Sequence, residues 1–198
     1  MADPDIDASR SGAIADDGWH TRARHVESPN QDARPASVSI ELLVIHNISL
    51  PPGRFGGDAI EALFTNRIDP AGHPSFASLA GLRVSAHFLI RRDGALVQFV
   101  PCTRRAWHAG VSAWRGRERC NDFSVGVEME GTDLRRYTER QYQRLTALAR
   151  ALRTAYPSLC GVAGHEEIAP GRKTDPGPAF DWQRFMAATG WSKSMRRV

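Results

Sequence analysis

Histidine and aspartate side chains at three separated positions have the composition of a catalytic metal site. His46 ends an apolar run and precedes a loop rich in proline and glycine, His165 follows the run GVAG, and Asp175 lies ten residues after His165. Two imidazoles and one carboxylate would give zinc three protein ligands and leave its fourth tetrahedral position open, as catalytic zinc requires. Spacing alone does not decide the ligands. Three further histidines remain candidates: His73, His87 and His108.

A carboxylate and an ammonium group could complete such a site. The run FSVGVEM alternates like a half-buried strand, which places Glu128 on the opposite face from Val125 and Val127. A carboxylate beside zinc can accept a proton and return it to a leaving amine. Lys173 lies two residues before Asp175, so one loop can carry both side chains. The alternative for Glu128 is a carboxylate with a structural role, and the alternative for Lys173 is a loop lysine exposed to solvent.

Apolar runs and turn residues predict the strands that would hold these groups. The run SIELLVI at 39–45 is long enough for a central strand, and it ends at His46. Within residues 86–100, two apolar runs flank Asp93 and Gly94, and Asp-Gly supplies the positive φ angles of a tight hairpin turn. We therefore expect one strand that leads into His46 and one hairpin.

Capping residues and helical periodicity predict the helices. Thr138 and Gln141 form a capping box at the start of a main helix over 138–156, where apolar residues recur at helical spacing. Asp58 can cap a short helix through its side chain. A short amphipathic segment follows at 180–185.

Strands mixed with helices, without a strict βαβ repeat, indicate an α/β fold of the α+β type, with a central mixed β-sheet flanked by helices. A chain of 198 residues can bury one sizeable core. We expect a flexible leader at 1–18, a single domain at 19–190 and a C-terminal tail at 191–198. Within the domain, residues 19–35 show neither helical nor strand periodicity and are expected to be irregular. The run GVAG at 161–164 is expected to be flexible.

Composition and charge narrow the function classes. The net charge of +4 comes almost entirely from arginine, but 22 acidic residues are interspersed and no long basic run is present, so we expect no nucleic-acid partner. No apolar stretch approaches the roughly 18 residues of a membrane helix, and residues 1–18 contain no signal-peptide core. Three widely spaced cysteines without a CxxC pair favour a reducing compartment. We therefore expect a soluble cytoplasmic protein without a membrane partner.

Six sequence motifs are more specific evidence for a protein family than the spacing of possible metal ligands. They are HNISLPPG at 46–53, SAHFLIRRDG at 85–94, RAWHAGVS at 105–112, GRERCNDFS at 116–124, VEMEGTD at 127–133 and RKTDPG at 172–177. In this order they resemble the AmpD-type anhydro-N-acetylmuramyl-L-alanine amidases, with a similarity from about Trp19 to Trp182. The resemblance implies a zinc amidase fold like that of peptidoglycan-recognition proteins. It also implies hydrolysis of the amide bond between (anhydro-)N-acetylmuramic acid and L-alanine of muropeptides.

The resemblance further implies roles for the residues singled out above. His46, His165 and Asp175 would hold one Zn²⁺ per chain. Glu128 would take a proton from the attacking water and return it to the leaving amine, and Lys173 would stabilise the oxyanion. The implied substrate-binding residues are Asn47, Arg83, Trp107 and Arg119.

Two further histidines and two acids lie in or beside the matching motifs. For His87 and His108 we expect hydrogen-bonding roles rather than metal ligation. Glu166 and Glu167 depart from the family pattern, in which a small residue or a cysteine directly follows the ligand at His165. Extra negative charge there could raise the pKa of a nearby water or point to solvent, which leaves the pH optimum open.

These implications favour cytoplasmic cell-wall recycling, in which a monomer acts on small anhydromuramyl peptides. The alternative within the family is an exported N-acetylmuramoyl-L-alanine amidase, an autolysin that acts on intact wall. A non-catalytic peptidoglycan-recognition module is a third reading, since related folds bind wall fragments without cutting them. A module that only binds would not need three metal ligands together with Glu128 and Lys173. Nucleic-acid binding through arginine would instead predict strongly salt-dependent affinity for DNA.

Overall fold

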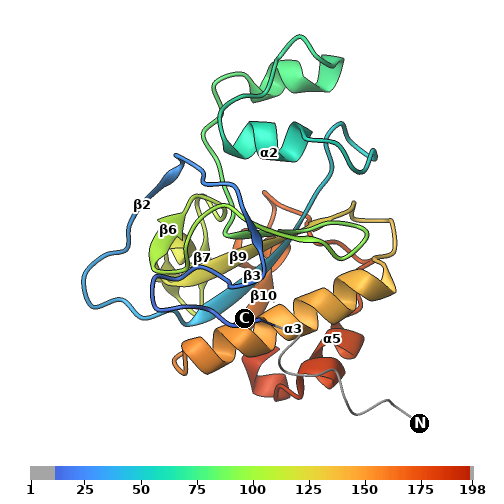
Figure 1. The fold of residues 1–198 in the computed structure, drawn as a ribbon. Helices are drawn as coiled ribbons and strands as arrows, with labels where there is room; N and C mark the ends of the chain where they lie inside the picture. Colours follow the sequence, from blue (N-terminus) through green and yellow to red (C-terminus); the bar gives the residue numbers. More distant parts are fainter. Residues whose placement is uncertain (1–11, 197–198) are drawn as a thin grey trace.

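The computed structural model describes residues 12–196. Its centre is a six-stranded sheet with the order β1-β5-β4-β9-β3-β10 (Figure 1). The strands span Arg24–His25 (β1), Leu96–Gln98 (β5), Phe88–Ile90 (β4), Ser124–Glu130 (β9), Leu42–Ile48 (β3) and Gly161–Gly164 (β10). β4, β9, β3 and β10 run parallel to one another, whereas β5 pairs antiparallel with β4. The predicted mixed sheet is confirmed.

Helices and two small ribbons surround this sheet. The helices are α2 (Ala59–Phe64), α3 (Glu139–Ala155), α4 (His165–Ile168) and α5 (Trp182–Thr189), with 3-10 helices η1 (Pro74–Leu79), η2 (Cys120–Asp122) and η3 (Lys193–Arg196). The ribbons pair β2 (Gln31–Ala33) with β6 (Arg104–Ala106), and β7 (Ala113–Trp114) with β8 (Arg117–Glu118). In Figure 1, α3 and α5 lie together under the sheet, and α2 lies at the opposite end of the molecule. No helix among residues 12–196 combines the length and the apolar character needed to cross a membrane.

One face of the sheet is packed against helices, and the other face also carries the polar side chains of the candidate site. On one face, Ile45 and Val127 pack in a single buried core with Leu145 and Leu148 of α3 and Phe185 of α5. This face follows from the alternation of apolar residues in the strands and their helical spacing in α3. Truncating a buried leucine of such a core to alanine costs about 2–5 kcal/mol. On the opposite face, Leu42 and Val44 pack in a second buried core with Trp114 and Phe123. Polar side chains join this face at the carboxyl ends of the strands, where His46 and Glu128 lie.

Three predicted elements are confirmed. The hairpin pairs β4 with β5 in the register Leu89↔Val97, and it turns through Gly94 at φ +85°. Asp93 does not have the expected positive φ, and its Oδ1 instead accepts the Ala95 N–H at 2.9 Å. β9 places Val127 in the core away from Glu128, as its alternation predicts. α3 begins with a complete capping box between Thr138 and Gln141.

Four other predictions need correction. The strand predicted at 39–45 begins at Leu42 and continues through His46 to Ile48, because it pairs with β9 along its whole length. Residues 19–35 are not wholly irregular, since they contain β1, which extends the central sheet, and β2. GVAG is the buried strand β10, against which the ring of Trp114 packs. Asp58 precedes α2, but its side chain makes no capping hydrogen bond.

The predicted domain limits remain predictions. Residues 1–11 of the expected leader lie outside the described residues. Residues 12–18 are held to the domain, for example by the Gly18 carbonyl, which accepts a hydrogen bond from the Cys102 N–H at 2.9 Å. In the expected tail, Met195 is buried and Arg196 forms an ion pair with Glu167.

Candidate metal centre and active site

The carboxyl ends of two neighbouring strands and one loop bring the candidate ligands together. β3 carries His46, and β10 pairs with β3 in the register Gly164↔Ile45, so His165 follows at the level of His46. His165 is the first residue of α4, and its side chain is buried. Asp175 comes from the loop after α4, whose start is tied to it by a 2.9 Å hydrogen bond from Glu166 N–H to the Asp175 carbonyl.

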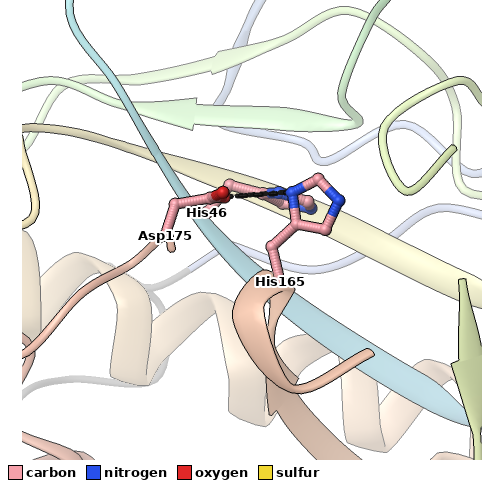
Figure 2. A group of neighbouring side chains, drawn as sticks. All are labelled: His46, His165 and Asp175. Carbon is pink, nitrogen blue, oxygen red and sulfur yellow. Dashed lines mark hydrogen bonds and ion pairs between the residues drawn. The ribbon is translucent and has the colours of Figure 1, made fainter. Parts of the chain in front are cut away.

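The three side chains converge on one point (Figure 2). His46 Nδ1 lies 2.9 Å from His165 Nδ1 and 3.0 Å from Asp175 Oδ2. His165 Nδ1 lies 3.1 Å from the same carboxylate oxygen. Among residues 12–196, these three form the group of histidine, cysteine and acidic side chains with the geometry to hold a metal ion.

The donor set fits zinc. Two imidazole nitrogens and one carboxylate oxygen are the ligand types that zinc takes, and a cation between them would satisfy all three lone pairs at once. Burial lowers the pKa of His46 to about 4, which keeps its imidazole neutral as metal binding requires. Burial opposes ionisation of Asp175, but hydrogen bonds with His165 and His46 outweigh it and hold the pKa of Asp175 well below its ordinary value. The carboxylate is therefore ionised at neutral pH.

Glu128 lies beside this cluster. It is the register partner of His46 on β9, and partners on neighbouring strands point to the same face. The side chain is buried, and its Oε2 has no hydrogen-bond partner in the described part of the chain. Burial, with a smaller contribution from the charge of Asp175, raises the pKa of Glu128 well above its ordinary value. A carboxyl group in this state can hold a proton and release it at the cluster.

Lys173 is carried by the loop that leads to Asp175. Its backbone N–H donates to the Ala169 carbonyl at 3.1 Å, and its side chain is exposed. Its positive charge acts on the cluster, because it lowers the pKa of His46 and opposes the rise in the pKa of Glu128. Its ammonium group makes no hydrogen bond or ion pair with the described residues.

Asn47 follows His46 but is occupied within the protein. Its amide donates to Asp133 Oδ1 at 2.7 Å and to the Pro176 carbonyl at 3.1 Å. Tyr137 donates its hydroxyl to the same carbonyl at 2.9 Å. These bonds fix the loop directly after Asp175. The sequence did not predict this contact of Tyr137, because its position just before the main helix marks it only as an aromatic residue that flanks a helix.

The other predicted substrate-binding residues lie outside the cluster. Arg83 is exposed and makes no hydrogen bond or ion pair with residues 12–196. The side chain of Arg119 is 71% exposed and pairs with Asp122 at 3.2 Å. Trp107 is half-buried next to His108, and its backbone N–H donates to Ser85 Oγ at 3.1 Å. None of the three belongs to the cluster of possible metal ligands.

His87 and His108 make hydrogen bonds, as expected. His108 Nδ1 lies 2.9 Å from His46 Nε2, so it contacts a ligand rather than acting as one. His87 accepts from the Gly126 N–H at 3.0 Å through Nδ1. His73 caps η1 by accepting from the Ser75 N–H.

The two acids after His165 are partly neutralised. Glu167 forms an ion pair with Arg196 and accepts the Gly164 N–H at 2.6 Å. Glu166 is half-buried, and burial raises its pKa to about 7.

A cavity of about 560 Å³ opens on the Asp175 side of the site and is lined by Asn47, Thr132, Asp133, Leu134, Thr174 and Pro178. A larger cavity of about 710 Å³ along α3 has none of the predicted site residues in its lining.

Comparison with known proteins identifies the family that has this arrangement. A family model described as N-acetylmuramoyl-L-alanine amidase matches residues 32–178. The chain belongs to this family. It is 61% identical over 175 residues to the 1,6-anhydro-N-acetylmuramyl-L-alanine amidase AmpD of Citrobacter freundii, a match that covers 88% of this chain and 94% of that protein.

Solved structures agree with this amidase assignment. The crystal structure of an Se-Met AmpD derivative matches at a TM-score of 0.86 and 61% identity, over 88% of this chain and 98% of that chain. AmiD of E. coli, in complex with the substrate anhydro-N-acetylmuramic acid-L-Ala-D-gamma-Glu-L-Lys, matches at a TM-score of 0.57 and 30% identity, over 91% of this chain and 66% of that chain. The predicted fold and the predicted N-acetylmuramoyl-L-alanine amidase activity are therefore confirmed.

Proposed function

We propose that this amidase hydrolyses the bond between 1,6-anhydro-N-acetylmuramic acid and L-alanine of free muropeptides, in cytoplasmic cell-wall recycling. The observation that carries the proposal is the buried His46, His165 and Asp175 cluster with Glu128 on the same sheet face. The extent of the match to AmpD of Citrobacter freundii, nearly the full length of both proteins, supports the anhydro sugar as the substrate.

In this proposal His46, His165 and Asp175 would hold one Zn²⁺, with Nδ1 of each histidine and Oδ2 of Asp175 as the atoms that face one another. When bound, zinc supplies Lewis-acid polarisation of the substrate carbonyl and makes a water molecule more acidic. Nε2 of each histidine contacts another residue of the protein, so Nδ1 of each ring is left to bind the metal.

Glu128 is the proton carrier. It accepts a proton from the attacking water as the C–O bond forms, and it gives that proton to the alanine nitrogen as the C–N bond breaks. The raised pKa of Glu128 suits the first step, because a carboxylate with a raised pKa is a stronger base toward the attacking water. The Lys173 ammonium stabilises the negative charge that develops on the carbonyl oxygen.

The substrate-binding residues extend this site outward. Arg83 and Arg119 present guanidinium groups that suit the carboxylates of a stem peptide, since arginine binds carboxylates in a planar, bidentate way. The half-buried indole of Trp107 offers a flat surface to the sugar or its lactyl group. Asn47 shapes the site through the loop after Asp175. We further propose that the enzyme works as a monomer on these small substrates.

The test is the substrate preference of the zinc-loaded protein. Equal amounts of enzyme are given an anhydromuramyl tripeptide, the same tripeptide on a reducing muramic acid, and intact sacculi, and released peptides are identified by mass spectrometry. We expect a peptide that begins with L-alanine, released fastest from the anhydro substrate. Faster release from intact sacculi would favour the exported amidase, and binding of fragments without release would favour the recognition module.

A further inference from the structure

Each ligand histidine has one ring nitrogen that faces away from the three donors. His165 Nε2 lies 3.1 Å from the Ala109 carbonyl oxygen, and because a carbonyl can only accept, this nitrogen carries the proton. His46 Nε2 lies 2.9 Å from His108 Nδ1, and His108 Nε2 lies 3.1 Å from Ser124 Oγ. When His46 donates to His108 and His108 donates to Ser124, Nδ1 of His46 keeps its lone pair for the metal. Partners on the second nitrogen commonly fix metal-binding histidines in this way.

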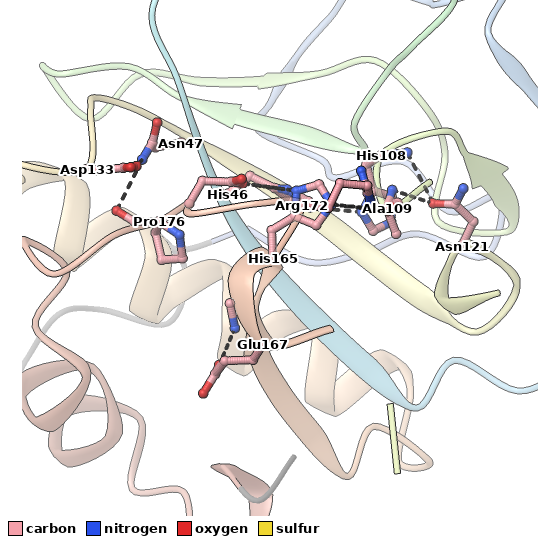
Figure 3. A network of polar contacts seen from close by, with 12 residues as sticks. His46, Asn47, His108, Ala109, Asn121, Asp133, His165, Glu167, Arg172 and Pro176 are labelled. Atoms are coloured by element: carbon pink, nitrogen blue, oxygen red, sulfur yellow. Dashed lines mark hydrogen bonds and ion pairs between the residues drawn. The ribbon is translucent and has the colours of Figure 1, made fainter. Parts of the chain in front are cut away.

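The groups that hold both histidines belong to two adjacent residues, His108 and Ala109. One side-chain oxygen, Oδ1 of Asn121, accepts the backbone N–H of both residues, at 3.1 Å from His108 and 2.8 Å from Ala109. Figure 3 shows Asn121 on one side of this pair, with His46 and His165 on the other side. A single amide oxygen therefore sets the position of both outer partners.

Asn121 and the pair that it holds are fixed in turn by their surroundings. Half-buried Arg34 donates from Nη1 to the Asn121 backbone carbonyl at 3.2 Å and from Nη2 to the Ser124 backbone carbonyl at 2.8 Å. The His108 ring packs directly on the backbone of β9 at Gly126, where a Cβ atom would lie 2.5 Å from His108 Cγ. The glycine thus leaves room for the ring that contacts His46.

A second contact restrains the Ala109 carbonyl. Arg172 donates from Nη2 to this carbonyl and to that of Val111, both at 2.6 Å. The loop that carries Lys173 and Asp175 is thereby joined to the segment that Asn121 holds. Displacement of the segment would reach both the ligands and this loop.

We propose that Asn121 is a positioning residue for the metal centre: it holds His108 and Ala109, which orient His46 and His165. The inference rests on the zinc site proposed above. Asn121 acts only through this pair, since it makes no hydrogen bond to the three donors within residues 12–196. Without its oxygen, two neighbouring N–H groups lose their acceptor, and both imidazoles lose a fixed partner at once.

The experiment measures the zinc dissociation constant of the full-length wild type, Asn121→Ala and Asn121→Asp by competition with a chelator of known affinity. Alanine removes the acceptor, whereas aspartate keeps an oxygen in its place. We expect zinc binding by Asn121→Ala to weaken about 10–100-fold, the usual effect of losing such outer partners. We expect Asn121→Asp to recover most of this loss. The visible spectrum of the Co²⁺-loaded protein should change in the alanine variant and resemble that of the wild type in the aspartate variant.

Asn30→Ala is the matched control, because Asn30 is a buried asparagine that also joins separate segments. Its amide donates to the Val84 carbonyl at 2.8 Å and to Asn66 Oδ1 at 2.9 Å. We expect Asn30→Ala to lower the melting temperature and to leave the zinc dissociation constant unchanged.

Three results would overturn the inference. They are wild-type zinc affinity in Asn121→Ala, an equal loss of affinity in Asn30→Ala, and no recovery in Asn121→Asp. If Asn121→Ala does not fold, Asn121→Ser replaces it, since the shorter hydroxyl cannot reach both N–H groups. A wild type that binds no zinc would overturn the proposed metal site itself, which separates the two failures.

Discussion

His46 and Glu128 lie directly opposite each other on the parallel strands β3 and β9. Residues paired in this way point to the same face of a sheet, so one strand pair presents both the His46 imidazole and the Glu128 carboxyl group to the same space. The opposite face of the same strands is packed against α3, which makes the pair rigid. The separation between the proposed metal ligand and the proposed proton carrier is thus set by the spacing of neighbouring strands rather than by a loop.

Loss of one ligand should remove the metal without unfolding the domain. We predict that His165→Ala retains well under half of the zinc that the wild type binds, about one ion per chain, after dialysis. His73→Ala is the matched control, because His73 caps η1 and contributes no donor to the cluster. Zinc content is measured by elemental analysis. Equal zinc in His165→Ala and wild type would show that the ligand is assigned wrongly.

Glu128 should destabilise the zinc-free protein at neutral and alkaline pH. Its pKa is raised in the folded state, so above about pH 4 the folded state holds more protons at this site than the unfolded state does. Stability is therefore lost as the pH rises from the unfolded pKa through the folded pKa. We predict that Glu128→Gln raises the free energy of unfolding of the zinc-free protein at pH 8, with a gain that disappears near pH 4.

Chemical denaturation at a series of pH values measures this effect. Glu27→Gln, at an exposed position, is the control and should leave the pH dependence unchanged. Bound zinc should reduce the gain, because its positive charge favours the ionised form of Glu128. A gain that is independent of pH would show that burial of the charge is not its cause.

Local patterns predicted β9 and α3 because each carries its own signal. The alternation around Val125 and Val127 needs only one buried face, and the capping box at Thr138 is formed by residues close in sequence. β10 has no such signal, since it contains two glycines and an alanine. It is a strand because it lies between β3 and the ring of Trp114, and a Cβ at Gly161 would lie 2.2 Å from that ring.

The choice of ligands could not be made from spacing for a similar reason. His108 lies as close to His46 as His165 does, at 2.9 Å, yet it meets the other nitrogen of the His46 ring. Only the fold decides which ring nitrogen faces the three donors. The motifs shared with the amidases predict the ligands because they report the fold indirectly. The Asn121 contacts were not predicted, since two backbone N–H groups leave no pattern in side-chain types.

Lys173 should affect turnover without affecting the metal. We predict that Lys173→Ala lowers kcat about 10²–10³-fold, the usual effect of removing one group that stabilises an oxyanion, and leaves zinc content unchanged. The chain contains one other lysine, Lys193, which provides the matched control. Lys193→Ala should keep the wild-type rate. A similar rate for both variants would remove Lys173 from the site.

The exposed arginines should affect substrate binding more than chemistry. We predict that Arg83→Ala raises KM for an anhydromuramyl tripeptide about 10-fold, as loss of a charge-assisted hydrogen bond of roughly 1.5 kcal/mol implies, with a smaller change in kcat. Arg119→Ala should behave alike. Arg67→Ala, an exposed arginine that donates to Thr65, is the control. Steady-state kinetics separate the two parameters, and an unchanged KM in both variants would contradict the assignment.

Zinc-dependent cleavage by the wild type and by Glu128→Ala, measured together with zinc content on the same samples, tests the central claim most directly. The wild type should release peptide from an anhydromuropeptide, lose this activity after chelation and regain it when zinc is returned. Glu128→Ala should bind the same amount of zinc while its turnover falls about 10²–10⁴-fold, the contribution expected of a general acid and base. A near-normal rate for Glu128→Ala, or full activity of the wild type without zinc, would contradict the account.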